Sequence, residues 1–355
     1  MARISGSKSS SLFFISFLLA SLVLVSSEGL ARPPPIVRGL DWNYYLLSCP
    51  RVERIVRKHL EDVFEKDSGV APGILRLFFH DCFSQGCDAS ILLNLAEGKN
   101  ETERDHPANF GLRDEAIQTI ENLRALIRGQ CPRVVSCADI LVIAAREAVR
   151  QFGGPDFDVP LGRKDNPEYD EDSPENLPVP FKRTDEQLSD FFEPKKFDAT
   201  DLVALSGAHT FGRAHCLTLF NRTTDPSPPI DPDFKNQLVA TCPEDKQFIN
   251  TVNLDIRTPT KFDNMYYINL LNHQGVFTSD QDLASHPKTK EIVNRFASNQ
   301  KEFFDKFANA FVKVSQLDVL TGNQGEVRKS CFAPNKKKFN VASMVEEVVG
   351  IAANM

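Results

Sequence analysis

The stretch from Arg76 to Ser90 constrains the fold most, because it joins a helical pattern to a short loop between two cysteines. Arg76 and His80 are four residues apart, so on a helix they share one face. Arg is almost never buried without a partner, and its charge keeps a nearby imidazole neutral. A neutral His can accept a proton while Arg stabilises a developing negative charge. For the pair alone, a surface Arg and a core His is the alternative.

The loop after His80 favours a functional site over the alternative of a surface Arg and a core His. Cys82 and Cys87 are placed to close it. Oxygen donors are spread along it: the side chains of Asp81, Asp88 and Ser90 and the carbonyls of Ser84 and Gly86. Hard oxygen donors of this kind suit a cation such as calcium.

The stretch resembles the distal haem motif of the plant secretory (class III) haem peroxidases. Phe78 departs from that pattern, because a second His is common at this position; we treat the change as neutral. The resemblance implies that Arg76, His80 and Asn109 are catalytic, with the Asn109 amide oxygen accepting a hydrogen bond from one ring nitrogen of His80. It also implies that Phe79 contacts the haem and shields the reacting centre. Electron transfer at the haem edge is then favoured over oxygen insertion.

A second stretch, from Asp201 to Gly212, ends an apolar helix on His209. Small residues flank this His and would let a flat group approach closely: Gly207, Ala208 and Gly212. A lone His here is most often structural, but the segment resembles the proximal haem motif of the same family. The resemblance implies that His209 is the axial iron ligand and that Asp280 accepts a hydrogen bond from its other ring nitrogen. By itself, Asp280 is typical of a loop or a helix N-cap.

The resemblance also implies two calcium ions, one beside each histidine. Both donor sets consist of the hard oxygen atoms that calcium prefers. The distal set is Asp81, Ser84, Gly86, Asp88 and Ser90, and the proximal set is Thr210, Asp255, Thr258, the Lys261 carbonyl and Asp263. Plain turns are the alternative for such loops, but the complete spacing argues against it.

The eight cysteines form a disulfide framework if the chain is secreted. Eight cysteines allow about a hundred pairings, so the sequence alone does not choose among them. The resemblance implies the pairs Cys49–Cys131, Cys82–Cys87, Cys137–Cys331 and Cys216–Cys242. A zinc site is the alternative and is weak, because the chain has no tight Cys-x-x-Cys pair.

The N-terminus carries Arg3 and Lys8, then an apolar run from Leu12 to Val25, which predicts a secretory signal peptide over 1–31. The run is shorter than the roughly 20 residues of a membrane span, and no other segment is apolar enough for one. We predict a Pro-rich segment over 32–44, a haem peroxidase domain over 45–331 and a C-terminal extension over 332–355. Asn100 and Asn221 begin glycosylation sequons.

The apolar periodicity predicts a mainly α-helical chain with few strands. The resemblance implies the haem-peroxidase fold, in which helical distal and proximal halves sandwich one haem. We read 153–180 as a long surface loop, and Ser136 and Asp198 as the starts of helices. Helices are expected over 52–64, from Pro72 to the loop, and over 114–127, 137–152, 198–207, 262–274, 288–297 and 301–314.

Together these features predict a secreted haem peroxidase with one haem b. It would reduce hydrogen peroxide to water and oxidise phenolic or aromatic donors in one-electron steps near Pro178. The net charge of −7 argues against a nucleic-acid partner. We expect a monomer without a membrane partner, in the cell wall or, through its C-terminal extension, in the vacuole. The rival is a non-catalytic haem- or calcium-binding wall protein on the same fold.

Overall fold

The computed structural model describes residues 34–225 and 227–336, and every structural statement below refers to these residues. They form a mainly α-helical fold with one small antiparallel sheet, in which β1 (Arg213–His215) pairs with β2 (Thr251–Asn253). The helices are α1 (Val52–Lys66), α2 (Val70–Ser84), α3 (Asp114–Gln130), α4 (Cys137–Gln151), α5 (Thr184–Glu186), α6 (Ala199–Ser206), α7 (Phe220–Thr224), α8 (Pro232–Thr241), α9 (Met265–Leu271), α10 (Thr278–Leu283), α11 (Lys290–Ser298) and α12 (Gln300–Val314).

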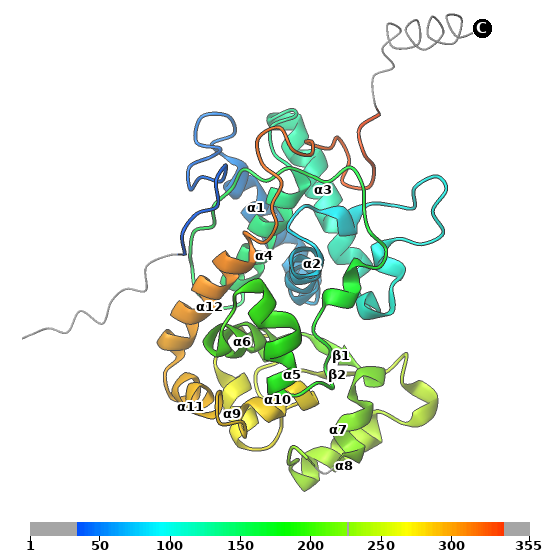
Figure 1. Ribbon diagram of the computed structural model, residues 1–355, viewed down its shortest axis with the longest axis vertical. Helices are drawn as coiled ribbons and strands as arrows, with labels where there is room; N and C mark the ends of the chain where they lie inside the picture. Colours follow the sequence, from blue (N-terminus) through cyan, green and yellow to red (C-terminus); the bar gives the residue numbers. More distant parts are fainter. Residues whose placement is uncertain (1–33, 226, 337–355) are drawn as a thin grey trace, which may run out of the picture. The chain divides into compact units, whose positions relative to one another are not determined.

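The first four helices pack together, with α4 at their centre (Figure 1). Helix α4 contacts α1, α2 and α3, and nearly every one of its residues is buried. Helix α1 instead buries a single stripe at helical spacing: Val52, Val56, Leu60 and Phe64. Helix α2, which carries Arg76 and His80, is therefore held between α4 and α3.

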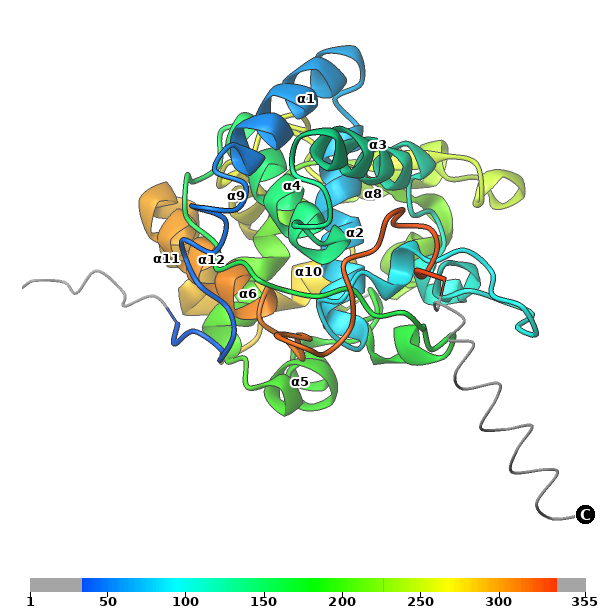
Figure 2. The same ribbon diagram turned by 90° about the horizontal axis from the view of Figure 1, so that it is seen from above.

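The later helices form a second group, seen below the first in Figure 1. Helix α12 packs along α6 (Figure 2). It also contacts α2. Helix α9 packs on α11 and contacts α10. One apolar core runs through both groups, and a smaller one lies under α8, β1 and β2.

The predicted helix starts at Ser136 and Asp198 are confirmed. The Ser136 hydroxyl accepts a hydrogen bond from the Asp139 backbone N–H, and Asp198 and Asp201 form a reciprocal capping box. The helix predicted over 262–274 is shorter, because α9 begins at Met265 and ends at Leu271. Helices α8 and α10 and the β1–β2 pair were not predicted from the sequence.

The reading of 153–180 as a surface loop is wrong for its middle part. Leu161, Arg163 and Asp165 are buried. The backbone of Leu161 exchanges two hydrogen bonds with Asp41, and that of Asp165 exchanges two with Glu326. The segment is therefore an interior connection between the two ends of the fold.

The folded part extends past both predicted ends. The Val37 backbone N–H donates to Gln316 Oε1 at 2.8 Å, so the fold begins before residue 45. Asn335 donates its backbone N–H to Glu326 Oε1 at 2.8 Å and its side-chain amide to the Val327 carbonyl at 3.0 Å. The predicted signal peptide and residues 337–355 of the predicted extension lie outside the described residues.

The four disulfides pair the cysteines as the resemblance implies: Cys49–Cys131, Cys82–Cys87, Cys137–Cys331 and Cys216–Cys242. No helix in 34–225 or 227–336 has the length and apolar character needed to cross a membrane.

Candidate active site

His80 lies near the end of α2 with a different partner on each ring nitrogen. Its Nδ1 is 2.6 Å from Asn109 Oδ1, and its Nε2 accepts a hydrogen bond from Arg76 Nε at 3.2 Å. An amide oxygen only accepts and a guanidinium only donates. Nδ1 therefore carries the proton and Nε2 carries the lone pair. This is the tautomer that a base acting through Nε2 requires.

The electrostatics keep this imidazole neutral. Burial, and then the Arg76 charge, lower the pKa of His80 to about 3, although the Asn109 hydrogen bond opposes the shift. Burial also lowers the pKa of Arg76 to about 10, so the guanidinium stays charged at neutral pH. Arg76 Nη2 is anchored on the Phe110 carbonyl at 2.9 Å. A neutral acceptor and a fixed cation thus lie side by side.

Asn109 is held in turn by Glu103, which the sequence analysis did not single out. Asn109 Nδ2 donates to the Glu103 carbonyl oxygen at 2.6 Å. The Glu103 side chain is buried, and burial raises the pKa of its carboxyl to about 8. Gln85 Nε2 donates both to Glu103 Oε1 at 3.2 Å and to Ser90 Oγ at 3.0 Å. The cysteine-closed loop and the His80 partner therefore share one hydrogen-bonded network.

Phe79 lies beside His80 on α2. Its ring stacks on Phe83 with centroids 4.7 Å apart and is 6.2 Å from the imidazole centroid. The side chain is half-buried, so its ring borders the space next to His80.

The distal loop gathers the predicted oxygen donors. Asp81 Oδ2 accepts the Ala89 backbone N–H at 3.0 Å, while Asp81 Oδ1 and Glu103 Oε2 are buried without a partner. Burial, then the charges of Asp88 and Glu103, raise the pKa of Asp81. Buried carboxylates with unmatched oxygens repel one another, so a divalent cation fits this loop well. Ser84 Oγ donates instead to Ser173 Oγ at 2.9 Å, which leaves the Ser84 carbonyl as its predicted donor.

His209 lies in the short turn after α6, Gly207–Thr210, and Asp280 on α10 faces its ring. His209 Nδ1 is 2.8 Å from Asp280 Oδ1. The same carboxylate accepts the Tyr266 hydroxyl at 2.9 Å and the Phe277 backbone N–H at 3.2 Å. A carboxylate held by three donors fixes the proton on Nδ1 and leaves the Nε2 lone pair for a metal. Tyr266 lies in the apolar run of α9, so its sequence pattern indicated only a core residue.

Two of the glycines near His209 also lie against other parts of the protein. A Cβ on Gly207 would lie 2.3 Å from the Tyr267 hydroxyl and 2.5 Å from the Phe303 ring. Gly212 has a φ of +97°, and a Cβ there would lie 2.9 Å from Pro72 on α2. These glycines allow the His209 turn to pack against α9, α12 and α2.

The proximal oxygen donors also converge. Thr210 and Thr258 both donate their hydroxyls to Asp263 Oδ1, at 3.2 and 3.0 Å. Thr210 Oγ1 is 3.5 Å from the Lys261 carbonyl. Asp255 is fully buried, and its Oδ2 has no partner. An orphaned buried carboxylate oxygen beside these groups fits a cation.

The predicted donor rim, 177–181, is tied to the element that carries Asp280. Pro178 is half-buried within it. The Ser279 backbone N–H donates to the Pro180 carbonyl at 3.0 Å, and Gln187 Nε2 donates to the Val179 carbonyl at 2.7 Å. The rim is therefore fixed relative to α10.

An open cavity of 320 Å³ is lined by residues of the 104–117 segment, including Asn109 and Phe110, but by neither His80 nor His209. Among the described residues, no group of three or more His, Cys, Asp or Glu side chains is arranged to hold a metal ion. The two oxygen sets use carbonyls and hydroxyls beside their carboxylates, so a cation there would need this mixed set of ligands.

In this helical fold, Arg76 and His80 on α2 meet Asn109 from the turn at 107–109, and His209 from the turn after α6 meets Asp280 on α10. These two sets define the class of haem peroxidases. The family model described as Peroxidase matches residues 56–299. Peroxidase 12 from Arabidopsis thaliana is 45% identical over 350 residues, which cover 97% of this chain and 96% of that protein. Cationic peroxidase SPC4 from Sorghum bicolor is 43% identical, covering 93% and 91%. Peroxidase 1 from Zea mays is 38% identical, covering 92% of each chain.

The chain belongs to the class III plant peroxidases. It is accordingly a haem peroxidase enzyme, which uses hydrogen peroxide and reducing donors. The predicted recognition, fold class and enzyme class are confirmed, and no comparison favours the non-catalytic alternative.

Proposed function

We propose that the chain binds one haem b and that His209 Nε2 would hold its iron. The hydrogen bond between His209 Nδ1 and Asp280 supports this assignment, because it leaves the Nε2 lone pair available. Asp280 gives the imidazole anionic character, which makes it a stronger electron donor to iron. The bound haem supplies the oxidising chemistry with hydrogen peroxide; the residues described next move the proton and shape the access.

His80 acts as base and then as acid on hydrogen peroxide. Its Nε2 takes a proton from one oxygen and delivers it to the other, so that the O–O bond breaks and water leaves. The observation that carries this role is the pair of contacts that fixes the tautomer, Asn109 on Nδ1 and Arg76 on Nε2. Arg76 stabilises the negative charge that develops as the bond breaks.

Phe79 limits access on the side of His80, and phenolic or aromatic donors give up single electrons near Pro178. The side chains of Phe79 and Pro178 are both half-buried, which supports these two separate roles. Blocking the reacting centre with a ring excludes bulky donors while leaving the haem edge open to them.

Two calcium ions would brace the elements that carry His80 and His209. The distal ion would take Asp81, Ser84, Gly86, Asp88 and Ser90, and the proximal ion Thr210, Asp255, Thr258, Lys261 and Asp263. The buried, unpartnered oxygens of Asp81 and Asp255 support both sites. Each set adjoins a functional histidine in sequence, so a bound cation would restrain that histidine's element.

We also infer that the protein is secreted as a monomer. Four disulfides and the absence of a free cysteine among the described residues support an oxidising compartment. Asn100 is exposed and suits a glycan, whereas the side chain of Asn221 lies outside the described residues. The extension after residue 331 makes delivery to the vacuole an alternative to the cell wall.

A spectrum and an assay test the proposal together. The purified holoprotein should show a Soret band and oxidise a simple phenol only when hydrogen peroxide is added. His209→Ala should lose or grossly alter the Soret band, while His80→Ala should keep it and lose the activity. An unchanged spectrum in His209→Ala would contradict the axial assignment, and a haem-bound but inactive wild type would favour the non-catalytic alternative.

A further inference from the structure

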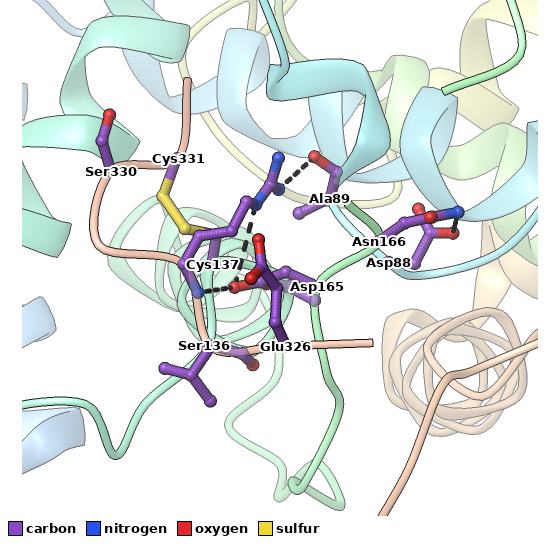
Figure 3. Close-up of polar contacts among 12 residues, drawn as sticks. Asp88, Ala89, Ser136, Cys137, Asp165, Asn166, Glu326, Ser330 and Cys331 are labelled. Atoms are coloured by element: carbon purple, nitrogen blue, oxygen red, sulfur yellow. Dashed lines mark hydrogen bonds and ion pairs between the residues drawn. A yellow bond between two sulfur atoms is a disulfide. The ribbon is translucent and has the colours of Figure 1, made fainter. Parts of the chain in front are cut away.

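Three residues outside the distal loop hold it in place, and we call them the bracket: the buried Asp165 and Arg328 and the half-buried Asn166. Its members come from the interior connection after α4 and from the chain end near Cys331. None of them is in the cation set named above. Figure 3 shows Asp165 beside Cys137 and Asn166 next to Asp88.

Asn166 donates two hydrogen bonds to Asp88. Its backbone N–H donates to the Asp88 carbonyl at 2.9 Å, and its side-chain Nδ2 donates to Asp88 Oδ2, also at 2.9 Å (Figure 3). Asn166 Oδ1 accepts the Glu168 backbone N–H at 3.1 Å, which fixes the amide with its N–H groups toward Asp88. The other Asp88 oxygen, Oδ1, accepts the Ser90 backbone N–H at 3.0 Å. Both oxygens of this carboxylate are therefore oriented before any ligand binds.

The rest of the bracket holds the next residue of the loop. Arg328 is fully buried, and its Nη2 donates to the Ala89 carbonyl at 2.5 Å. Ala89 has a φ of +61°, a left-handed conformation that a non-glycine residue adopts at a cost. Asp165 keeps Arg328 in place by accepting its backbone N–H at 2.8 Å.

We propose that Asn166 is a positioning residue of the distal cation loop: it orients the Asp88 carboxylate and thereby sets the affinity of the loop for calcium. A carboxylate ligand that is already oriented loses less freedom when the ion binds. The proposal rests on the calcium sites proposed above and deepens the distal one.

The variant Asn166→Ala tests this, because it removes the side-chain hydrogen bond and keeps the backbone one. Asn166 lies half-buried at the end of the connection, so its truncation leaves no large cavity. The probe is Ca²⁺ alone, titrated by calorimetry into holoenzyme freed of calcium with a chelator. Asp88→Asn identifies the distal equivalent, and Asn122→Ala, an exposed change on α3, is the control.

We expect one of two calcium equivalents to weaken by about 10–100-fold in Asn166→Ala, the same equivalent that Asp88→Asn removes. The calcium affinity of the other equivalent should match that of the wild type. In Asn122→Ala, the affinities of both equivalents should match those of the wild type. Without calcium, Asn166→Ala should unfold at a slightly lower temperature than the wild type, because one hydrogen bond is lost. Calcium should then raise the unfolding temperature less in the variant, so that the difference between the two proteins grows when the ion is added. A general packing defect would instead lower the unfolding temperature equally with and without the ion.

Two results would overturn the proposal, and they differ. If Asn166→Ala binds both equivalents within twofold of wild type while Asp88→Asn loses one, the positioning role is wrong and the calcium site stands. If the wild type itself binds no Ca²⁺ at the distal loop, the calcium proposal fails and the positioning role fails with it.

Discussion

At the scale of single residues, the two functional histidines differ in the partner of Nδ1. His80 faces the neutral amide of Asn109, whereas His209 faces the carboxylate of Asp280. A neutral partner fixes the tautomer without adding charge, and Arg76 then keeps His80 unprotonated. A carboxylate partner adds electron density, which suits a ligand to oxidised iron. The difference in partner charge thus matches the proposed difference in role.

The first prediction concerns this carboxylate. Asp280→Asn should keep the haem but lower the iron–histidine stretching frequency in resonance Raman spectra, because His209 loses anionic character. Turnover should fall by about 10–100-fold, the usual cost of losing such a partner. Tyr266→Phe removes only one of the donors to Asp280, so its frequency should shift less. An unchanged frequency in Asp280→Asn would show that the carboxylate does not tune the ligand.

At the scale of elements, α1 and α4 are joined by a buried charge cluster. Glu147 on α4 is fully buried and pairs with Arg57 at 3.2 Å, Arg146 at 2.9 Å and Arg150 at 2.8 Å. Burial alone would raise the pKa of Glu147, but these arginines outweigh it and lower the pKa overall. The ionised carboxylate therefore stabilises the packing of the helices that surround α2.

The second prediction follows from the sign of that shift. Because the folded pKa is depressed, the stabilisation is present above the unfolded value of about 4.3 and is lost as the pH falls through the folded value. Glu147→Gln should lower the free energy of unfolding at pH 7 by about 3 kcal/mol. This value is at the low end of the range for breaking a buried ion pair, because two of the arginines are partly exposed.

Thermal unfolding from pH 7 to pH 3 measures this effect. The difference in stability between wild type and Glu147→Gln should stay constant down to about pH 5. It should shrink below the ordinary glutamate pKa of about 4.3. Glu61→Gln, an exposed change on α1, is the matched control and should leave no such difference. A difference that widens in acid would contradict the assigned sign.

The presence of most helices could be predicted from the apolar periodicity, but the points at which a helical pattern is interrupted could not. The pattern over 262–274 is helical, yet α9 starts at Met265 because Asp263 Oδ1 accepts the Met265 backbone N–H beside the proximal donors. Helix α8 has an Asp231 cap and Pro232 at its first position, but only two buried apolar residues, so its periodic signal is weak.

The two functional histidines could be found from the sequence because each lies in a contiguous motif. The residues that hold the site in place could not be found in this way. Glu103 acts on Asn109 and Gln85, which are 6 and 18 residues away, and Asn166 acts on Asp88, which is 78 residues away. An isolated Glu or Asn in a polar loop carries no signal of such a role. The pairing of the cysteines likewise came from the resemblance rather than from their spacing.

At the scale of the whole molecule, the interior connection joins the first and last parts of the described chain to the site. Its residue Leu161 pairs with Asp41, and its residue Asp165 pairs with Glu326. The fold therefore includes residues that the sequence analysis had assigned to the flanking segments.

The third prediction is a pair of truncations. Ending the chain after Lys336 should leave the melting temperature and activity unchanged. Ending it after Cys331 removes the Asn335 hydrogen bonds to Glu326 and Val327 and the Phe332 carbonyl that accepts the Asn94 backbone N–H. At about 0.5–1.5 kcal/mol per hydrogen bond, a loss of roughly 2 kcal/mol in unfolding free energy is expected. Equal stability of the two truncations would contradict this boundary.

The fourth prediction is that calcium supports both halves of the site. Chelation leaves the buried Asp81 and Asp255 oxygens without a partner, so melting temperature and activity should fall together and return with added Ca²⁺. Magnesium at the same concentration is the control, because its smaller octahedral shell suits these loops poorly. Full activity in a sample verified to be free of calcium would refute the prediction.

The central claim, that His80 moves the proton of hydrogen peroxide, is tested most directly by stopped-flow mixing of the holoenzyme with peroxide. The rate of the first spectral change should fall by about 10²–10⁴-fold in His80→Ala. Arg76→Leu should be less damaging, and Asn109→Ala should be the mildest, at about 10–100-fold. The later reaction with donor should change far less in all three variants. If His80→Ala gave the first spectral change at the wild-type rate, the account of this site would be wrong.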